Sequence, residues 1–147
     1  MSFRDRFRRL EVTALVAGLL MGLAACAAVP TSVSVETLLK TEASWDGTPY
    51  ERYPDGAPEL TVLKITIPPR TALAWHRHAM PNAAYVVSGE LLVEKRDGGQ
   101  TIRLVAGDVL PEMVEGVHRG VTGDVPVVLI VFYAGARGLP VSETLDK

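Results

Sequence analysis

Three histidines are the residues of this chain whose types and spacing best suit metal chemistry. His76 and His78 are two positions apart in a segment that we expect to be a strand, so both rings leave the same face. His118 follows forty residues after His78, at the start of another expected strand. Neutral imidazole binds Zn, Fe, Cu and Ni. The pattern predicts one divalent metal ion held by the three rings; the alternative is a polar histidine cluster inside an apolar barrel.

The elements that must position these histidines read as short strands between turns. Gly89 indicates a tight bend, and residues 97–99 indicate a hairpin turn. We expect residues 41–59 to be loop and residues 135–147 to be an irregular tail that packs outside. After residue 26, no segment has the period of an amphipathic helix, so the spacing predicts an all-β antiparallel sandwich or barrel. The expected strands are 60–67, 72–78, 83–87, 90–95, 100–105, 109–111, 117–121 and 125–133.

Two motifs surround the histidines. The first contains His76, His78, Asn82 and Gly89, and the second runs from Gly107 to His118 through Asp108, Met113 and Glu115. Seventeen residues separate Gly89 from Gly107, the length of a hairpin. Together they resemble the two motifs of the cupin superfamily, in its small single-domain form, and the resemblance covers most of residues 60–133. It implies a small antiparallel jelly-roll β-barrel with one metal ion on three histidines and one glutamate.

The sequence departs from that pattern at three positions. Met113 replaces a common proline and Glu115 a common glycine, changes that alter a turn. Asn82 stands where the family usually has its glutamate. The resemblance therefore assigns the metal to His76, His78, His118 and Asn82, with Asn82 as a weak neutral ligand or a hydrogen-bond partner of the site. A neutral fourth group leaves the metal near +2, so we expect bound water to be more acidic than with glutamate.

The resemblance implies work on a small organic molecule, dioxygenase-like or isomerase-like, with Fe, Mn, Zn, Ni or Cu as the metal. Non-haem iron on three histidines occurs among cupin dioxygenases. The alternative is a non-catalytic cupin that binds a metal or a small ligand. We expect Tyr85, Met113 and Phe132 to line a substrate pocket. Glu112 and Glu115 flank the second motif and could act as acid or base at the barrel mouth, but we favour their interpretation as solvated loop charges.

The first 25 residues read as an export signal. Four arginines lie within residues 1–9, an apolar stretch follows, and Cys26 ends a Leu-Ala-Ala-Cys sequence. This resembles the lipobox of bacterial lipoproteins and implies a signal peptide at 1–25, a lipidated Cys26 with a tether at 26–36, and a single domain at 37–147. The chain would then be anchored in the cell envelope, facing the periplasm, with Ala27 mildly favouring the outer membrane. The alternatives are a soluble secreted protein and an uncleaved amphipathic helix.

Composition limits the other function classes. The chain has 147 residues and is 48% hydrophobic, enough for one domain with a real core. Its net charge is −2, and no basic run follows the leader, which disfavours a nucleic-acid partner. A single cysteine excludes an intrachain disulfide. Residues 125–133 are apolar on both strand faces, which favours a homodimer that buries one of them.

Overall fold

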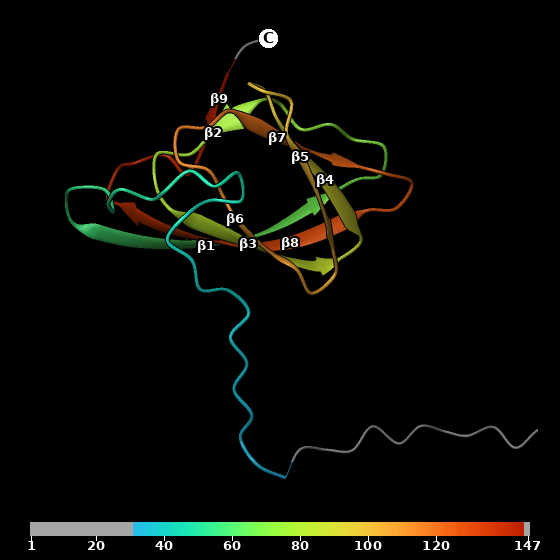
Figure 1. The fold of residues 1–147 in the computed structure, drawn as a ribbon, viewed down its shortest axis with the longest axis horizontal. Helices are drawn as coiled ribbons and strands as arrows, with labels where there is room; N and C mark the ends of the chain where they lie inside the picture. Colours follow the sequence, from blue (N-terminus) through green and yellow to red (C-terminus); the bar gives the residue numbers. More distant parts are fainter. Residues whose placement is uncertain (1–30, 146–147) are drawn as a thin grey trace, which may run out of the picture. The chain divides into compact units, whose positions relative to one another are not determined.

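A computed structural model describes residues 31–145, and within that range the regular elements are all strands (Figure 1). Residues 36–145 belong to one compact unit, which is the part treated below. The strands are β1 (Pro58–Ile67), β2 (His76–Arg77), β3 (Asn82–Ser88), β4 (Glu90–Lys95), β5 (Thr101–Val105), β6 (Val109–Pro111), β7 (His118–Thr122), β8 (Val127–Ala136) and β9 (Glu143–Thr144).

The nine strands form two antiparallel sheets that enclose the core between them. The first sheet has the order β1-β8-β3-β6, and the second has the order β5-β4-β7-β2-β9 (Figure 1). Two stacked antiparallel sheets of this kind make a jelly-roll-like fold, which confirms the predicted all-β class.

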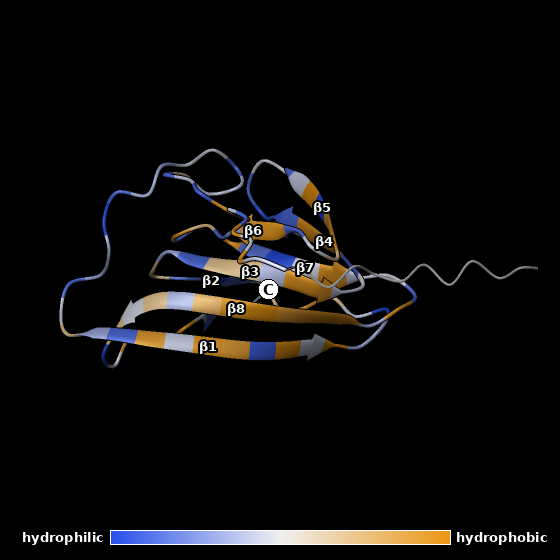
Figure 2. Ribbon diagram, turned by 90° about the horizontal axis from the view of Figure 1, so that it is seen from below, coloured by the Kyte–Doolittle hydropathy of each residue, from blue (hydrophilic) through white to orange (hydrophobic). Residues whose placement is uncertain are grey.

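Strand alternation separates the core from the outside. On β8, Val127, Leu129, Val131 and Tyr133 are buried at every second position, and they meet inward residues of β3 and β4. The residues between them face out of the first sheet. Figure 2 shows that β8 is apolar along much of its length, so its outer face is hydrophobic as well.

The bend between β3 and β4 requires the predicted glycine. Gly89 has a φ of 86°, in the left-handed region that favours glycine, and a Cβ there would collide with the carbonyl oxygen of Pro126. This bend carries the chain from the first sheet into the second.

The C-terminal tail differs from its prediction. Strand β8 continues to Ala136, and β9 then pairs with the edge of β2, so the expectation of an irregular, outside tail is wrong. Two physical reasons explain this. Without β9 the short strand β2 would have an unpaired edge, and Leu139 and Val141 are apolar side chains that pack against the core. The expected strand at 72–78 is reduced to β2, with only an isolated bridge between Ala72 and Val121 before it.

A loop segment is joined to the end of β6. Residues 43–50, which we name the strap, contain a bridge between Ala43 and Pro49. The amide of Trp45 donates to the carbonyl of Pro111, and this bond fixes the strap to the end of β6.

The membrane-related expectations concern another part of the chain. Cys26 and residues 1–25 lie outside the described residues. Among residues 31–145, no helix is long and apolar enough to cross a membrane.

Candidate metal centre

The second sheet brings the three histidines together. His76 opens β2 and pairs directly with His118, the first residue of β7. His78 follows one residue after β2 and bridges to Val114. The ring centroids lie 4.6 to 5.1 Å apart, and one potential ligand atom from each ring lies within 4.8 Å of the other two. The predicted convergence of the histidines is therefore confirmed.

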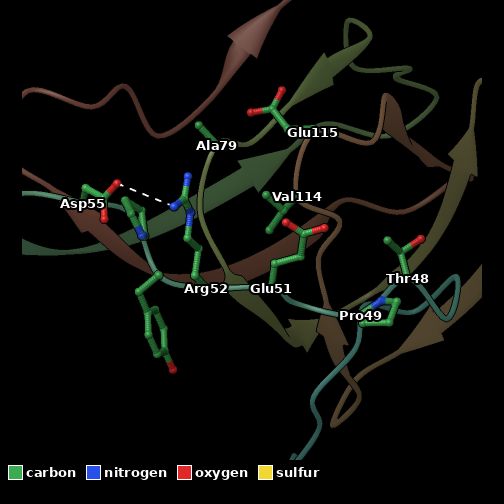
Figure 3. A pocket seen from close by; sticks show the side chains of 10 residues that line it. Thr48, Pro49, Glu51, Arg52, Asp55, Ala79, Val114 and Glu115 are labelled. Atoms are coloured by element: carbon green, nitrogen blue, oxygen red, sulfur yellow. Dashed lines mark ion pairs between the residues drawn. The ribbon is translucent and has the colours of Figure 1, made fainter.

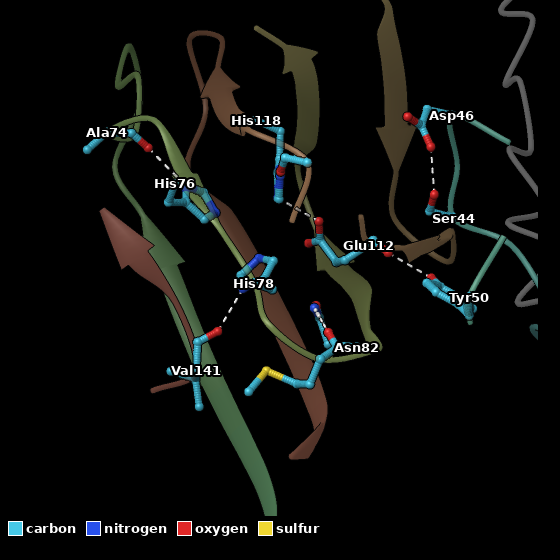
Figure 4. A network of polar contacts seen from close by, with 12 residues as sticks. Ser44, Asp46, Tyr50, Ala74, His76, His78, Asn82, Glu112, His118 and Val141 are labelled. Atoms are coloured by element: carbon cyan, nitrogen blue, oxygen red, sulfur yellow. Dashed lines mark hydrogen bonds and ion pairs between the residues drawn. The ribbon is translucent and has the colours of Figure 1, made fainter. Parts of the chain in front are cut away.

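Each ring is oriented by a backbone carbonyl. A carbonyl can only accept a hydrogen bond, so the neutral ring carries its hydrogen on Nδ1 and leaves a lone pair on Nε2. Carbonyl partners of this kind fix the tautomer and direction of metal-binding histidines. The contacts are His76 Nδ1 to Ala74 at 2.9 Å and His78 Nδ1 to Val141 at 2.7 Å (Figure 4). The third contact joins His118 Nδ1 to Gly116 at 2.9 Å.

Glu112 stands beside His118. It follows β6 directly and has the same inward parity as the buried Leu110. Its Oε2 lies 2.9 Å from His118 Nε2, and only 8% of the residue is exposed. The interpretation of Glu112 as a solvated loop charge is therefore wrong, and the alternation of Leu110 and Glu112 was the signal that could have located it.

The backbone of Glu112 is held from two sides. Its amide donates to the carbonyl of Asn82 at 3.0 Å, across the β3–β6 pairing. The hydroxyl of Tyr50, the last residue of the strap, donates to the carbonyl of Glu112 at 2.7 Å (Figure 4). The carboxylate is thus placed by a strand and by the strap together.

Burial and the carboxylate set the charges of the site. Burial lowers the pKa of His76 and of His78, which keeps both rings neutral at neutral pH. Burial alone would also lower the pKa of His118, but the adjacent Glu112 carboxylate reverses this and raises it. For Glu112, burial would raise the pKa, but the histidines, His118 foremost, leave it below its ordinary value. The pair therefore favours an anionic Glu112.

The contact between His118 and Glu112 needs a positive species between its two atoms. Because Nδ1 of His118 donates to Gly116, a neutral ring would turn the lone pair of Nε2 toward an oxygen lone pair 2.9 Å away. Neither atom has another hydrogen-bond partner among the described residues. A proton or a metal cation at this position satisfies both atoms at once.

The sequence comparison concerns the segment that carries this site. The family profile of the cupin domain matches residues 63–133, which include all three histidines and Glu112. The chain contains a cupin domain. No curated protein sequence gives a significant match.

Solved structures resemble the cupin domain in fold. The DMSP lyase DddQ from Ruegeria pomeroyi has 20% identity and a TM-score of 0.52 over 58% of this chain and 42% of its own. An uncharacterized conserved protein with a double-stranded beta-helix domain from Klebsiella pneumoniae has 21% identity and a TM-score of 0.51, covering 65% and 90%. The polyketide cyclase RemF from Streptomyces resistomycificus has 20% identity and a TM-score of 0.53, covering 63% and 65%. The match spans less than half the length of the lyase.

Asn82 occupies a different place from the three histidines. It opens β3 and is buried, but it does not line the cavity that the histidines and Glu112 share. Its Nδ2 donates to the carbonyl of Met80 at 3.2 Å, and its Oδ1 has no hydrogen-bond partner among the described residues. Its closest link to the site is the backbone hydrogen bond to Glu112.

The structure does not bring the three expected pocket residues together. Tyr85 and Phe132 alternate with buried neighbours on β3 and β8, so they face out of the first sheet, 36% and 41% exposed. Met113 is buried in the turn before β7, against Gly116. None of them lines the histidine cavity, whereas Tyr133 does. Burial, with a smaller contribution from Glu112, raises the pKa of Tyr133 to about 12, so its hydroxyl stays protonated.

The residues of the cupin domain fit a divalent ion. The cavity holds about 50 Å³, room for an ion and one or two waters. Three imidazole nitrogens and an anionic oxygen suit a borderline transition metal. The apolar remainder of the wall excludes competing polar ligands; it consists of Ile65, Ile67, Leu73, Leu91, Val93, Gly120, Leu129 and Val131.

A larger cleft lies on the surface beside the turn that leads to His118. It has a volume of about 390 Å³, and Figure 3 shows Arg52 and Glu115 among the side chains around it. The amide of Glu115 donates to the carbonyl of His78 at 2.8 Å, so one wall of the cleft is tied to the backbone of a histidine of the site. Glu115 has a φ of 59°, a strained conformation for a residue other than glycine.

Proposed function

We propose that this cupin domain binds one divalent metal ion through His76, His78 and His118 and acts on a small organic molecule. The carrying observation is that each Nδ1 is committed to a carbonyl while all three rings line one small cavity. Fe, Mn, Zn, Ni and Cu all suit this donor set. A bound ion would supply Lewis acidity or, for a redox metal, electrons for dioxygenase-like or isomerase-like chemistry.

The surface cleft is the best support for a small-molecule substrate. Small-molecule sites are typically clefts of about 300–1,000 Å³ with a few polar groups, and the cleft beside Glu115 has that size and character. Solved proteins of this fold include a DMSP lyase, an oxalate decarboxylase and a polyketide cyclase, all named for reactions of small molecules. We infer that the substrate of this chain binds in the cleft and approaches the metal from there.

The second candidate is a non-catalytic protein of the cell envelope that binds a metal or a small ligand. The volume of about 50 Å³ beside the histidines favours it, because such a cavity holds an ion and its water but no organic molecule. Turnover separates the two candidates, since a binder holds its ligand unchanged.

Metal analysis tests the proposal first. Protein purified without added metal is analysed for bound ions, and its unfolding temperature is measured with each of the five metals. A metal present at a hundred times its Kd stabilises the fold by about 2.7 kcal/mol. We expect this stabilisation to vanish in His76→Ala. A protein with no bound metal and no shift with any of the five contradicts the proposal.

A substrate panel then separates enzyme from binder. The metal-loaded protein is mixed with small carboxylic acids, enols and phenols, and oxygen consumption and product formation are followed. Turnover that requires His76 supports the enzyme. Binding without turnover across the panel supports the envelope binder.

We further propose that the chain is lipid-anchored at Cys26 and faces the periplasm. The Leu-Ala-Ala-Cys sequence after an apolar stretch supports this. Incorporation of labelled palmitate by the full chain, and its loss in Cys26→Ser, is the expected result. A wild-type chain without label, recovered in the soluble fraction, contradicts the anchor.

The outer face of the first sheet supports the homodimer. Leu60, Val62 and Phe132 are exposed at 68%, 60% and 41%, and Val62 pairs directly with Phe132. An apolar face of this kind commonly marks an interface. Sedimentation should show a dimer for the domain and a monomer for Val62→Lys. A wild-type domain that stays monomeric at every concentration contradicts the dimer.

A further inference from the structure

The strongest unexplained feature of the site is a buried carboxylate on the strand opposite Asn82. Asn82 and Glu112 are neighbours across the β3–β6 ladder, because Ala83 pairs with Pro111 and the amide of Glu112 donates to the carbonyl of Asn82. The amide side chain is on one strand and the carboxylate is on the other. Only Glu112 lines the histidine cavity.

We infer that Glu112 supplies the fourth, anionic ligand of the metal and that Asn82 is not a ligand. The inference rests on the proposed metal-binding function. The position where the family usually has its glutamate holds Asn82 in this chain. The carboxylate of Glu112 stands at the facing position across the β3–β6 pairing. The metal centre then has three neutral nitrogens and one negative oxygen, and its net charge falls from about +2 to about +1.

The distance between the two orphaned atoms supports shared ligation. Two ligand atoms that each lie about 2.1 Å from one ion, at right angles, are about 3 Å apart. Oε2 of Glu112 and Nε2 of His118 are separated by 2.9 Å, and neither has a hydrogen-bond partner among the described residues. Oδ1 of Asn82, the atom that an amide offers to a metal, also has no partner among the described residues, but Asn82 does not line the histidine cavity.

The placement of Glu112 also suits a ligand rather than a surface charge. Its side chain is 11% exposed, and its backbone is fixed by Asn82 on one side and by Tyr50 on the other. An isolated buried carboxylate is unfavourable unless it is paired or binds a metal. A proton on His118 or a metal ion between the carboxylate and the histidines would offset that penalty.

Glu115 offers a matched control. It is also a glutamate, three residues further on, and its loss removes the same charge from the same turn. Its side chain is 56% exposed and contacts Arg77 at 2.9 Å, and it does not line the histidine cavity. Glu115→Gln therefore controls for the loss of a carboxylate from this turn, whereas Glu112→Gln also removes the group that faces the histidines.

The test measures the metal Kd of the folded domain by chelator competition, with Zn²⁺ and Co²⁺ as probes. We expect Glu112→Gln to raise Kd about 10- to 100-fold, the range for losing a group that tunes a metal site, and Glu115→Gln and Asn82→Ala to change it far less. The visible spectrum of the Co²⁺ form should change in Glu112→Gln alone. The unfolding temperature of each metal-free variant, measured beside the wild type, shows whether that variant is folded.

Each other outcome overturns a specific statement. Wild-type protein that binds neither probe nor any of the five metals named above contradicts the proposed function itself. If the wild type binds but Glu112→Gln binds equally well, or Glu115→Gln weakens binding as much, the assignment of Glu112 as a ligand is wrong. Weaker binding in Asn82→Ala alone would return the ligand to Asn82. If Glu112→Gln does not fold, Glu112→Asp keeps the charge but withdraws the oxygen, and unchanged affinity there overturns the inference.

Discussion

Two buried carboxylates in this domain, Asp46 in the strap and Glu112 in the histidine cavity, have very different surroundings. The side chain of Asp46 is 2% exposed, and its carboxylate accepts three hydrogen bonds. The donors are the Lys95 ammonium at 2.6 Å, the Ser44 hydroxyl at 2.6 Å and the Thr48 amide at 3.1 Å. Oε2 of Glu112 faces an imidazole nitrogen and has no hydrogen-bond partner among the described residues. Figure 4 shows both groups, with Asp46 joined to Ser44 and Glu112 joined to His118 and Tyr50.

The difference separates stability from function. A carboxylate whose hydrogen bonds are all made within the chain stabilises the fold and needs no ligand. A buried carboxylate beside three converging imidazoles is incomplete until a cation arrives. Changes at Asp46 and Lys95 should therefore alter the free energy of unfolding, and changes at Glu112 should alter metal affinity.

The largest effect on stability is expected when the Asp46 charge is left without its cation. Lys95→Met removes the ammonium and leaves a buried carboxylate that only two neutral donors satisfy. Breaking a buried ion pair from one side costs about 3 kcal/mol. Urea unfolding of the metal-free domain measures this loss. If Lys95→Met lowers the free energy of unfolding by less than about 0.5 kcal/mol, Asp46 behaves like an ordinary surface charge. The contrast with Glu112 would then be wrong.

A smaller loss is expected for Asp46→Asn. The amide keeps a neutral oxygen for Ser44 and Thr48, and Lys95 is 25% exposed, so its ammonium can reach water. We expect a loss of about 2 kcal/mol, consistent with several charge-assisted hydrogen bonds replaced by neutral ones. The metal Kd should stay within about fivefold, because Asp46 acts on His118 only through space. A loss of metal binding as large as in Glu112→Gln would make the two carboxylates alike.

The pH dependence of unfolding should locate the same carboxylate. Burial would raise the pKa of Asp46, but Lys95, Ser44 and Thr48 hold it well below its ordinary value. Because the folded pKa of Asp46 lies below the unfolded value of about 3.9, its charged carboxylate contributes fully to stability above that pH. This contribution is lost as the pH falls toward the folded pKa. The difference between wild type and Asp46→Asn should therefore be constant from pH 6 to 8 and shrink below about pH 4. If the stability difference between wild type and Asp46→Asn grows as the pH falls, this prediction is contradicted.

The sequence predicted the histidines better than the carboxylate. The parity of a strand places His76 and His78 on one side, and the two motifs add His118, so three donors could be predicted without a structure. Glu112 is one residue beyond the expected strand at 109–111, where a charged residue is usually solvated. Its burial depends on the strap and on β3, which are contacts between distant parts of the chain.

The tail illustrates the same limit. Nothing in residues 139–144 indicates a strand by itself, and β9 exists because β2 offers an edge with which it can pair. The carbonyl of Val141 that orients His78 follows from that pairing. Local patterns predicted the long strands, whereas the hydrogen bonds that orient the ligands are tertiary and appear only in the folded chain.

Tyr50 connects the two regions and should give the smallest effect on stability. It belongs to the strap with Asp46, yet its hydroxyl donates to the carbonyl of Glu112 at 2.7 Å. Tyr50→Phe removes one partly buried hydrogen bond and should lower stability by about 1 kcal/mol. Because that bond also positions the Glu112 backbone, we expect the metal Kd to rise several-fold, less than in Glu112→Gln. Stability loss with an unchanged Kd would show that the strap supports the fold alone and that β3 positions Glu112 without it.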